Sequence, residues 1–260
     1  MQTTGKPYIS AILLLVIISI LGGSFANASS NRTAILRKKA QGYYWGKGVT
    51  QDYARALELY ETAAALGDPQ ASNIAGGMYY TGKGTLTNPY KAFRYLDYAA
   101  DQGQSTPDAS IALASFYLTG EIVPQNYTKA IQLYQDAADS GNSRAQLELG
   151  FLYYIGQGVA QDFSKAQEWF QKAALNNYNM AQYNLGIMWY TGNNGQNKSS
   201  LVDAYAWINI AASNFYQDAF ALREYLKSTL TQDQLHLAQQ KSKDLYDQIR
   251  TNMMSTTGSP

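Results

Sequence analysis

The chain repeats itself about every 36 residues. The first glycine of the repeated unit stands at positions 46, 82, 120, 156 and 192, so the steps are 36, 38, 36 and 36 residues. An aromatic residue closely precedes this glycine, and an Ala-Ala pair follows 17 to 19 residues after it. A period of this length is typical of a solenoid, in which each unit buries its apolar face only against its neighbours. Solenoids mostly present binding surfaces, so the period indicates a binding protein.

Residues 142–177 show how one unit is expected to fold. Apolar residues at helical spacing predict two helices, separated by Gly156-Gln157-Gly158, where glycine accepts the positive φ that ends a helix. Asp162 is placed to cap the second helix, because its carboxylate can accept from free backbone N–H groups. Asn88 takes the same position before another second helix, and Asp68 is placed to cap a first helix; each is followed by proline. The second helices end at residues that tolerate a left-handed backbone, namely Gly67, Gly103, Gly141 and Asn177.

These positions together resemble the Sel1-like repeat, a relative of the tetratricopeptide repeat. The clearest match, in the fourth unit, comprises Ala145, Leu149, Gly150, Tyr153, Gly156, Gly158, Val159, Asp162, Ala166, Trp169, Ala173 and Ala174. The third unit departs from the pattern, since Ala114 replaces the glycine of the Leu-Gly pair and residues 121–124 replace the glycine-rich turn. The resemblance implies an all-α fold, a right-handed α-solenoid of helix-turn-helix repeats. It also implies a non-enzymatic adaptor that binds a protein or peptide partner.

The repeats do not extend to the end of the chain. We predict five repeats within residues 29–214, then capping helices over 215–250 and a disordered tail over 251–260. The two closing helices are expected at Phe215–Lys227 and Thr231–Arg250, and Thr231 and Gln234 have capping-box spacing. A polar-faced terminal pair of this kind covers the last apolar face of a solenoid.

The N-terminus has the pattern of a secretory signal peptide. Lys6 precedes an apolar run at residues 9–21, and Ala26-Asn27-Ala28 provides a small-x-small cleavage site. The run is shorter than the roughly 20 residues that span a bilayer. We therefore predict a signal peptide over residues 1–28, with cleavage after Ala28. The alternative is an uncleaved anchor, and only in that case is membrane contact expected. Either way the repeats are predicted to be periplasmic or secreted.

Composition gives little support for catalysis. The chain has no cysteine and a single histidine, His236, so thiolate chemistry and histidine-rich metal sites are excluded. No phosphate-binding loop occurs, and a formal net charge of +1 gives no overall case for nucleic acid or an anionic membrane. We expect no catalytic residues, no cofactor and no metal. The oligomeric state is left open.

A candidate binding groove follows from the tetratricopeptide analogy, in which the first helix of each unit lines the concave face. Positions expected to point outward are polar in the second repeat (Gln70, Asn73 and Tyr80) and largely apolar or aromatic in the fourth and fifth repeats. We predict a partner-binding groove formed by Arg144, Leu147, Phe151, Tyr154, Met180, Tyr183, Ile187 and Tyr190. The alternative is that these side chains pack between repeats or under the closing helices.

The sequence leaves two biological roles open. The protein either regulates a complex of the bacterial envelope or engages a host protein after release. A carbohydrate- or peptidoglycan-associated binding module is the alternative of a different class, because tyrosine rings can stack on sugars.

Overall fold

The computed structural model describes residues 30–196 and 199–257, so the predicted signal peptide lies outside the described residues. Within these ranges all regular secondary structure is helical. The helices form two compact units, one ending at Ser105 and the other beginning at Thr106. Each unit consists of helical hairpins, as the α-solenoid prediction requires.

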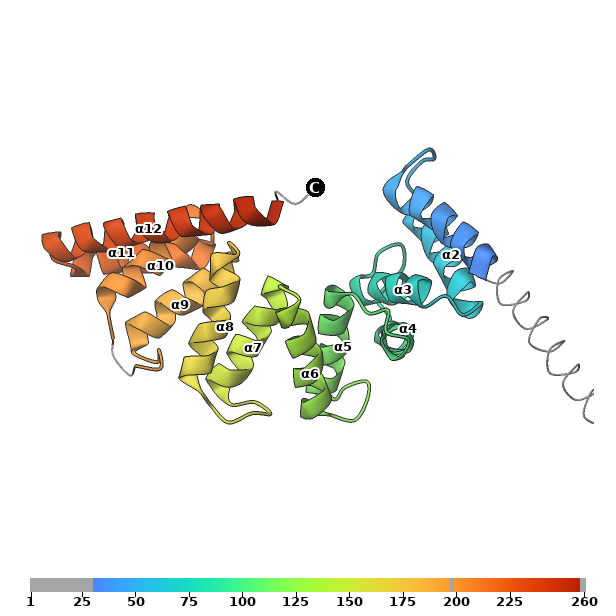
Figure 1. Ribbon diagram of the computed structural model, residues 1–260, viewed down its shortest axis with the longest axis horizontal. Helices are drawn as coiled ribbons and strands as arrows, with labels where there is room; N and C mark the ends of the chain where they lie inside the picture. The colour runs from blue at the N-terminus through green and yellow to red at the C-terminus, as the bar shows by residue number, and fades with distance from the viewer. Residues whose placement is uncertain (1–29, 197–198, 258–260) are drawn as a thin grey trace, which may run out of the picture. The chain divides into compact units, whose positions relative to one another are not determined.

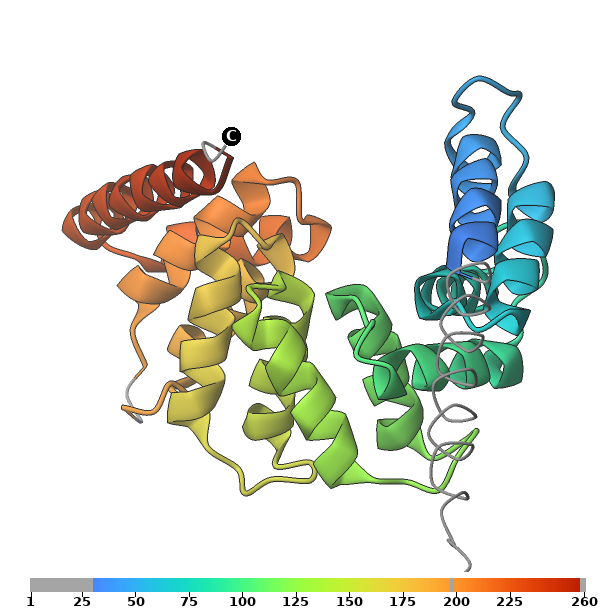
Figure 2. The same cartoon turned by 45° about the vertical axis from the view of Figure 1, so that its right-hand side comes forward.

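The first unit contains two hairpins. Residues 30–45 are helical, and Figure 2 shows this helix side by side with α2, to which a loop joins it. The other bounds are α2 Tyr53–Ala65, α3 Pro69–Thr81 and α4 Pro89–Asp101. The first helix of each hairpin is called an A helix below, and the second a B helix.

The second unit contains three further hairpins and the closing helices (Figure 1). Its A and B helices alternate as α5 Pro107–Thr119, α6 Tyr127–Asp139, α7 Ser143–Ile155, α8 Phe163–Leu175, α9 Asn179–Thr191 and α10 Leu201–Ser213. The closing helices are α11 Gln217–Thr229 and α12 Gln232–Thr257. Each helix from α2 to α11 has 13 residues, about 20 Å of helix.

Side-chain caps fix where most helices begin. The carboxylates of Asp68 and Asp162 accept from the N–H groups of Ala71 and Lys165, and the Asn88 side chain accepts from that of Lys91. The predicted left-handed ends are also present, with φ of 88° at Gly67, 67° at Gly103, 90° at Gly141 and 62° at Asn177. The local signals for the hairpins are therefore confirmed.

Within each compact unit, successive repeats pack through one stripe of the A helix. In α7 this stripe is Ala145, Leu149 and Leu152, which share a core cluster with the B-helix residues of the preceding hairpin, Tyr134, Ala137 and Ala138. Within a hairpin the A and B helices approach closely at a glycine. A Cβ at Gly150 would lie 2.4 Å from the ring of Phe170, so no larger residue fits without displacement.

The C-terminal region differs from the prediction in two places. Phe215 does not begin a helix but takes the left-handed position after α10, with φ of 60°, and α11 starts two residues later. The predicted disordered tail is helical as far as Thr257, because the first helix-breaking residue is Gly258 and Thr251 donates to the carbonyl of Asp247 within the helix. The capping box is present, since Thr231 and Gln234 exchange hydrogen bonds of 3.0 and 3.3 Å.

Helix α12 lies across α10 and reaches α8 with its C-terminal half (Figure 1). Ile249 is buried among residues of α8 and α10, with Leu245 packed beside it. The Ser242 hydroxyl donates to the carbonyl of Ala206 on α10 at 3.2 Å. This helix therefore covers the end of the second unit.

Candidate functional site

The predicted groove residues lie on the A helices α7 and α9 of the second unit. Arg144 and Met180, at the start of these helices, are exposed, whereas Leu147 is only 3 % exposed and belongs to the core between α7 and α8. The burial of Leu147 follows from its position in the repeat, since Ile111, at the same position of α5, is also buried. The remaining five predicted residues are half-buried.

The aromatic residues of α7 are held by the B helix of their own hairpin. The ring of Phe151 meets that of Phe170 edge-on at 5.2 Å, and the ring of Tyr154 lies 5.3 Å from that of Phe163. The Tyr154 hydroxyl also accepts from the side-chain amide of Asn193 at 3.2 Å. These contacts fix the two rings while leaving part of each at the surface.

The aromatic residues of α9 meet α11 and Tyr216, the residue just before it. The ring of Tyr183 lies 5.1 Å from that of Tyr216, and the ring of Tyr190 lies 6.2 Å from that of Tyr225. Burial, and secondarily Asp218, raises the pKa of the Tyr183 hydroxyl. Ile187 lies between these two tyrosines in the sequence and is half-buried.

Helix α11 continues the row of A helices. It follows a left-handed residue, as α9 does, and Ala219 is as completely buried as Ala181 at the same position of α9. The outward surface of α7, α9 and α11 is called the A-helix face below. The predicted groove residues therefore have packing roles and still contribute part of their surface to this face. Their role in binding stays a prediction.

Phe215 is a candidate that sequence reasoning missed. It is 84 % exposed and held at a φ of 60°, which bulky residues rarely adopt. Its neighbour Tyr216 contacts the ring of Tyr183 in a tilted arrangement, which places Phe215 at the edge of the A-helix face. Its position in the repeat could have indicated it, because Phe215 stands where earlier repeats have Gly67, Gly103, Gly141 and Asn177.

A polar network holds the loop that carries Phe215. The side-chain amide of Asn214 donates to Asn177 at 2.8 Å and to Gln182 at 2.9 Å. Gln182, which is fully buried, donates to the carbonyl of Ala174 at 3.2 Å. By contrast, the matching Gln146 of α7 donates to Ala138, and its buried Oε1 has no partner within the described part of the chain.

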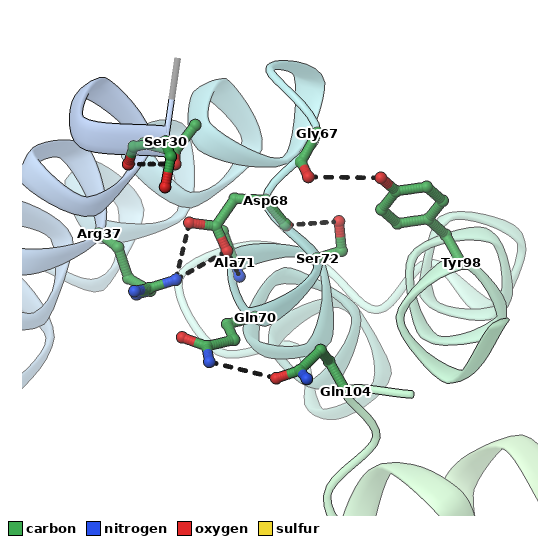
Figure 3. Close-up of polar contacts among 10 residues, drawn as sticks. Ser30, Arg37, Gly67, Asp68, Gln70, Ala71, Ser72, Tyr98 and Gln104 are labelled. Atoms are coloured by element: carbon green, nitrogen blue, oxygen red, sulfur yellow. Dashed lines mark hydrogen bonds and ion pairs between the residues drawn. The ribbon is translucent and has the colours of Figure 1, made fainter. Parts of the chain in front are cut away.

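The first unit contains a polar hollow of about 600 Å³ beside its A helices. Figure 3 shows Arg37 reaching the carboxylate of Asp68, with distances of 2.7 and 2.9 Å from one nitrogen. Below this pair the amide of Gln70 donates to Gln104 at 3.1 Å (Figure 3). Asp68 already caps α3, so the ion pair also orients the first helix against α3. The groups of this hollow are largely satisfied by one another.

A second hollow, of about 340 Å³, lies where α12 covers α8, α9 and α10. It combines two indole rings with amides and charged groups: Gln167, Gln171, Leu185, Trp189, Asp203, Trp207, Lys241, Asp244, Leu245 and Gln248. Trp207 is largely buried, and Lys241 pairs with Asp203 across the hollow at 2.5 Å. Neither tryptophan was selected from the sequence as a binding residue.

The described residues contain no cluster suited to a metal ion and no membrane-spanning helix. No three His, Asp or Glu side chains there come together in a way that could hold a metal ion. Among the same residues, no helix is both long and apolar enough to cross a membrane.

Comparison with known proteins gives one family model and several relatives. The model described as Sel1 repeat matches five segments, residues 40–68, 69–104, 107–142, 143–178 and 179–214. The chain is 33 % identical over 111 residues to chitin synthase regulatory factor 1 and 33 % over 108 residues to chitin synthase regulatory factor 3, both of Schizosaccharomyces pombe. These matches cover about 40 % of the chain and only 24 % and 11 % of the two yeast proteins.

Two solved structures share the fold over most of the chain. A Sel1 repeat protein from Oxalobacter formigenes is 29 % identical with a TM-score of 0.63, covering 85 % of this chain and 88 % of that one. A protective antigen of uropathogenic Escherichia coli strains is 26 % identical with a TM-score of 0.58, covering 90 % of this chain and 58 % of that one.

Proposed function

Because the chain belongs to the Sel1 repeat family, whose fold is a non-catalytic scaffold for protein interactions, we propose that it is an exported adaptor without enzymatic activity. In this proposal a protein or peptide partner binds along the A-helix face of the second unit. Arg144 and Met180 contribute exposed contacts, the tyrosines contribute their exposed edges, and Phe215 is the anchor.

The observation that carries this proposal is the strained and exposed Phe215. A left-handed backbone costs a residue with a Cβ roughly 1–2 kcal/mol, and every earlier repeat has glycine or asparagine at this position. An exposed phenylalanine gains almost nothing from packing that would offset this cost. A side chain held in this way is explained by what it does in a complex, where aromatic anchors dominate binding energy.

The regulatory role is favoured over host contact within this proposal. Its support is the similarity to two proteins named as regulatory factors of chitin synthase, although the chain spans a quarter or less of their length. The similarity to a protective antigen of Escherichia coli supports the alternative of contact with a host. Export rests on the N-terminal pattern, and cleavage after Ala28 would give a product that N-terminal sequencing identifies.

The test uses Phe215→Gly. This change removes the ring and relieves the backbone, so we expect the variant to be as stable as the native chain and to lose its partner. Phe215→Asn, which copies Asn177 of the preceding repeat, should behave in the same way. Leu86→Ala, at an equally exposed leucine of the first unit, is the matched control and should retain the partner.

The measurement is crosslinked affinity capture of the tagged chain from its native envelope, with thermal unfolding of each variant. A partner that is captured by the native chain and the Leu86 control but lost from both Phe215 variants supports the proposal. Equal capture by all four chains would remove Phe215 from the binding site.

The second candidate function, saccharide binding, is favoured by the hollow under α12. Indole faces beside amide and carboxylate groups are suited to stack on and hydrogen-bond a sugar ring. Retention of the native chain on purified peptidoglycan, lost on Trp189→Ala and kept in Phe215→Gly, would favour this function over the adaptor.

A further inference from the structure

The charge of the chain is unevenly distributed. Residues 1–51 contain six basic side chains and no acidic one, a net charge of +6. Residues 52–260 carry a net charge of −5, which together with the first segment gives the formal total of +1. The near-neutral total therefore hides a strongly basic N-terminal part.

The structure gathers three of these six basic side chains, Lys38, Lys39 and Lys47, beside one side of the first helix. A hollow of about 370 Å³ there is lined by Ile35, Lys38, Lys39, Gly42, Tyr43, Lys47 and Val49, which together with Trp45 are called the basic end face. Ile35 is 62 % and Trp45 63 % exposed, and all three lysines are exposed. Arg37 is not part of this face, because it pairs with Asp68 in the polar hollow.

The first acidic side chains after this face in the sequence, Asp52 just before α2 and Glu58 within it, make their contacts with Arg55. Asp52 caps α2 by accepting from the N–H of Arg55, and Glu58 pairs with the Arg55 guanidinium at 2.6 Å. The three lysines of the basic end face therefore keep an unbalanced positive charge.

Comparison with later repeats shows what kind of partner this face can take. Ile35, Lys39 and Gly42 occupy the frame positions of the α7 stripe that packs on the preceding hairpin. At the position of Lys39, later repeats have Ala75, Leu113, Leu149 and Leu185, none of them more than 1 % exposed. A repeat or second copy stacked here in the same way would bury an ammonium group without a partner, which is strongly unfavourable. The occupant must therefore offer anionic groups beside an apolar layer.

We propose that the basic end face docks on the surface of an anionic phospholipid bilayer. Headgroup phosphates pair with Lys38, Lys39 and Lys47, while Ile35 and Trp45 enter the interfacial layer that indole rings prefer. The apolar run at residues 9–21 ends 14 residues before Ile35, a span of at most about 50 Å. Until cleavage after Ala28, this run holds the face close to the bilayer that it enters, and after cleavage the lysines, Ile35 and Trp45 alone hold the docked face.

The test exploits the absence of cysteine from the chain. Gly42→Cys places a unique thiol in the hollow, where the new Cβ meets its nearest neighbour at an ordinary 3.5 Å. The full chain, labelled there with an environment-sensitive fluorophore, is mixed with vesicles of phosphatidylcholine alone or with phosphatidylglycerol. We expect a blue shift only with the anionic vesicles, reversed by high salt, and none from a label at Leu237→Cys on α12.

The lysines are then replaced together, as Lys38→Gln/Lys39→Gln/Lys47→Gln. Each lysine near an anionic surface contributes about five-fold, so the ratio of docked to undocked protein should fall on the order of a hundred-fold. The matched control, Lys165→Gln/Lys227→Gln/Lys243→Gln, removes the same charge from exposed lysines elsewhere and should keep the shift.

Three outcomes overturn the proposal. The first is an equal response to both vesicle types, and the second is an equal loss in the two triple variants. The third is a shift without vesicles, which would indicate that residues 1–29 or, where it depends on protein concentration, a second copy covers the face.

Discussion

Two adjacent glycines of α3 offer a direct measure of how closely the helices of one repeat approach. Gly76 faces the B helix, and a Cβ there would lie 2.7 Å from Cγ of Leu96 and 3.1 Å from its backbone nitrogen. Gly77 faces away, and a Cβ there would meet nothing within 4 Å. Gly76→Ala and Gly77→Ala therefore add the same methyl group to one helix in two different environments.

The expected energies follow from these distances. Alanine in place of glycine within a helix stabilises it by about 1 kcal/mol, and this gain applies to both variants. Gly77→Ala should therefore stabilise the first unit by about that amount. At Gly76 the methyl group overpacks against the buried Leu96, which typically costs about 1–3 kcal/mol. Because the gain in helix propensity is the same in both variants, Gly76→Ala should be about 1–3 kcal/mol less stable than Gly77→Ala.

The assay is native-state hydrogen exchange of peptides from α3 and α4, which reports the opening free energy of this unit alone. Equal protection in the two variants would refute the reasoning, because it would mean that the helices separate freely to admit a Cβ. The third repeat shows that the frame does accept alanine when its neighbour differs, since Ala114 is fully buried in the same cluster as Tyr134.

Three further predictions concern buried polar groups. Partial burial raises the pKa of Glu148 above its ordinary 4.5, so the folded chain binds this proton more tightly than the unfolded chain does. The stability of the fold therefore falls as the pH rises from about 4.5 through the raised pKa. Glu148→Gln should flatten this pH dependence of the urea midpoint and be the more stable form at neutral pH. Gln182→Met should lower the free energy of unfolding in urea by about 1–3 kcal/mol, because it leaves the Ala174 carbonyl and the Asn214 amide without this partner. Gln146→Met should lower it by less, since the side-chain carbonyl of Gln146 already has no partner among the described residues. Asp68→Ala should lower the stability of the first unit by about 1 kcal/mol more than Asp68→Asn, because asparagine still caps α3 while both changes break the ion pair with Arg37.

The hairpins could be predicted from the sequence because their signals are local. A cap such as Asp162 acts on the next three residues, and a left-handed end such as Gly141 acts within its own turn. Phe215 was placed in a helix because no local property of phenylalanine indicates a left-handed backbone. Only the stacking of the repeats imposes it.

The candidate site was less predictable, because the exposure of a side chain depends on the neighbouring repeat. Leu147 and Arg144 both fit the outward pattern of an A helix, yet one is in the core and the other at the surface. The rings of Tyr183 and Tyr190 are half-buried only because α11 continues the row of A helices. That continuation has weak sequence signals, since α11 falls outside the five matched repeats.

The path of α12 has a consequence for how the protein comes apart. In an ideal repeat array each repeat interacts only with its immediate neighbours, so the end can unfold one repeat at a time. Helix α12 packs on α10 and also on α8, and so ties together two hairpins that are consecutive in the stack. Neither hairpin can detach while Ile249 remains seated between them. Pulled from the C-terminus, the last two repeats should therefore stay folded until α12 is released and then open in a single step.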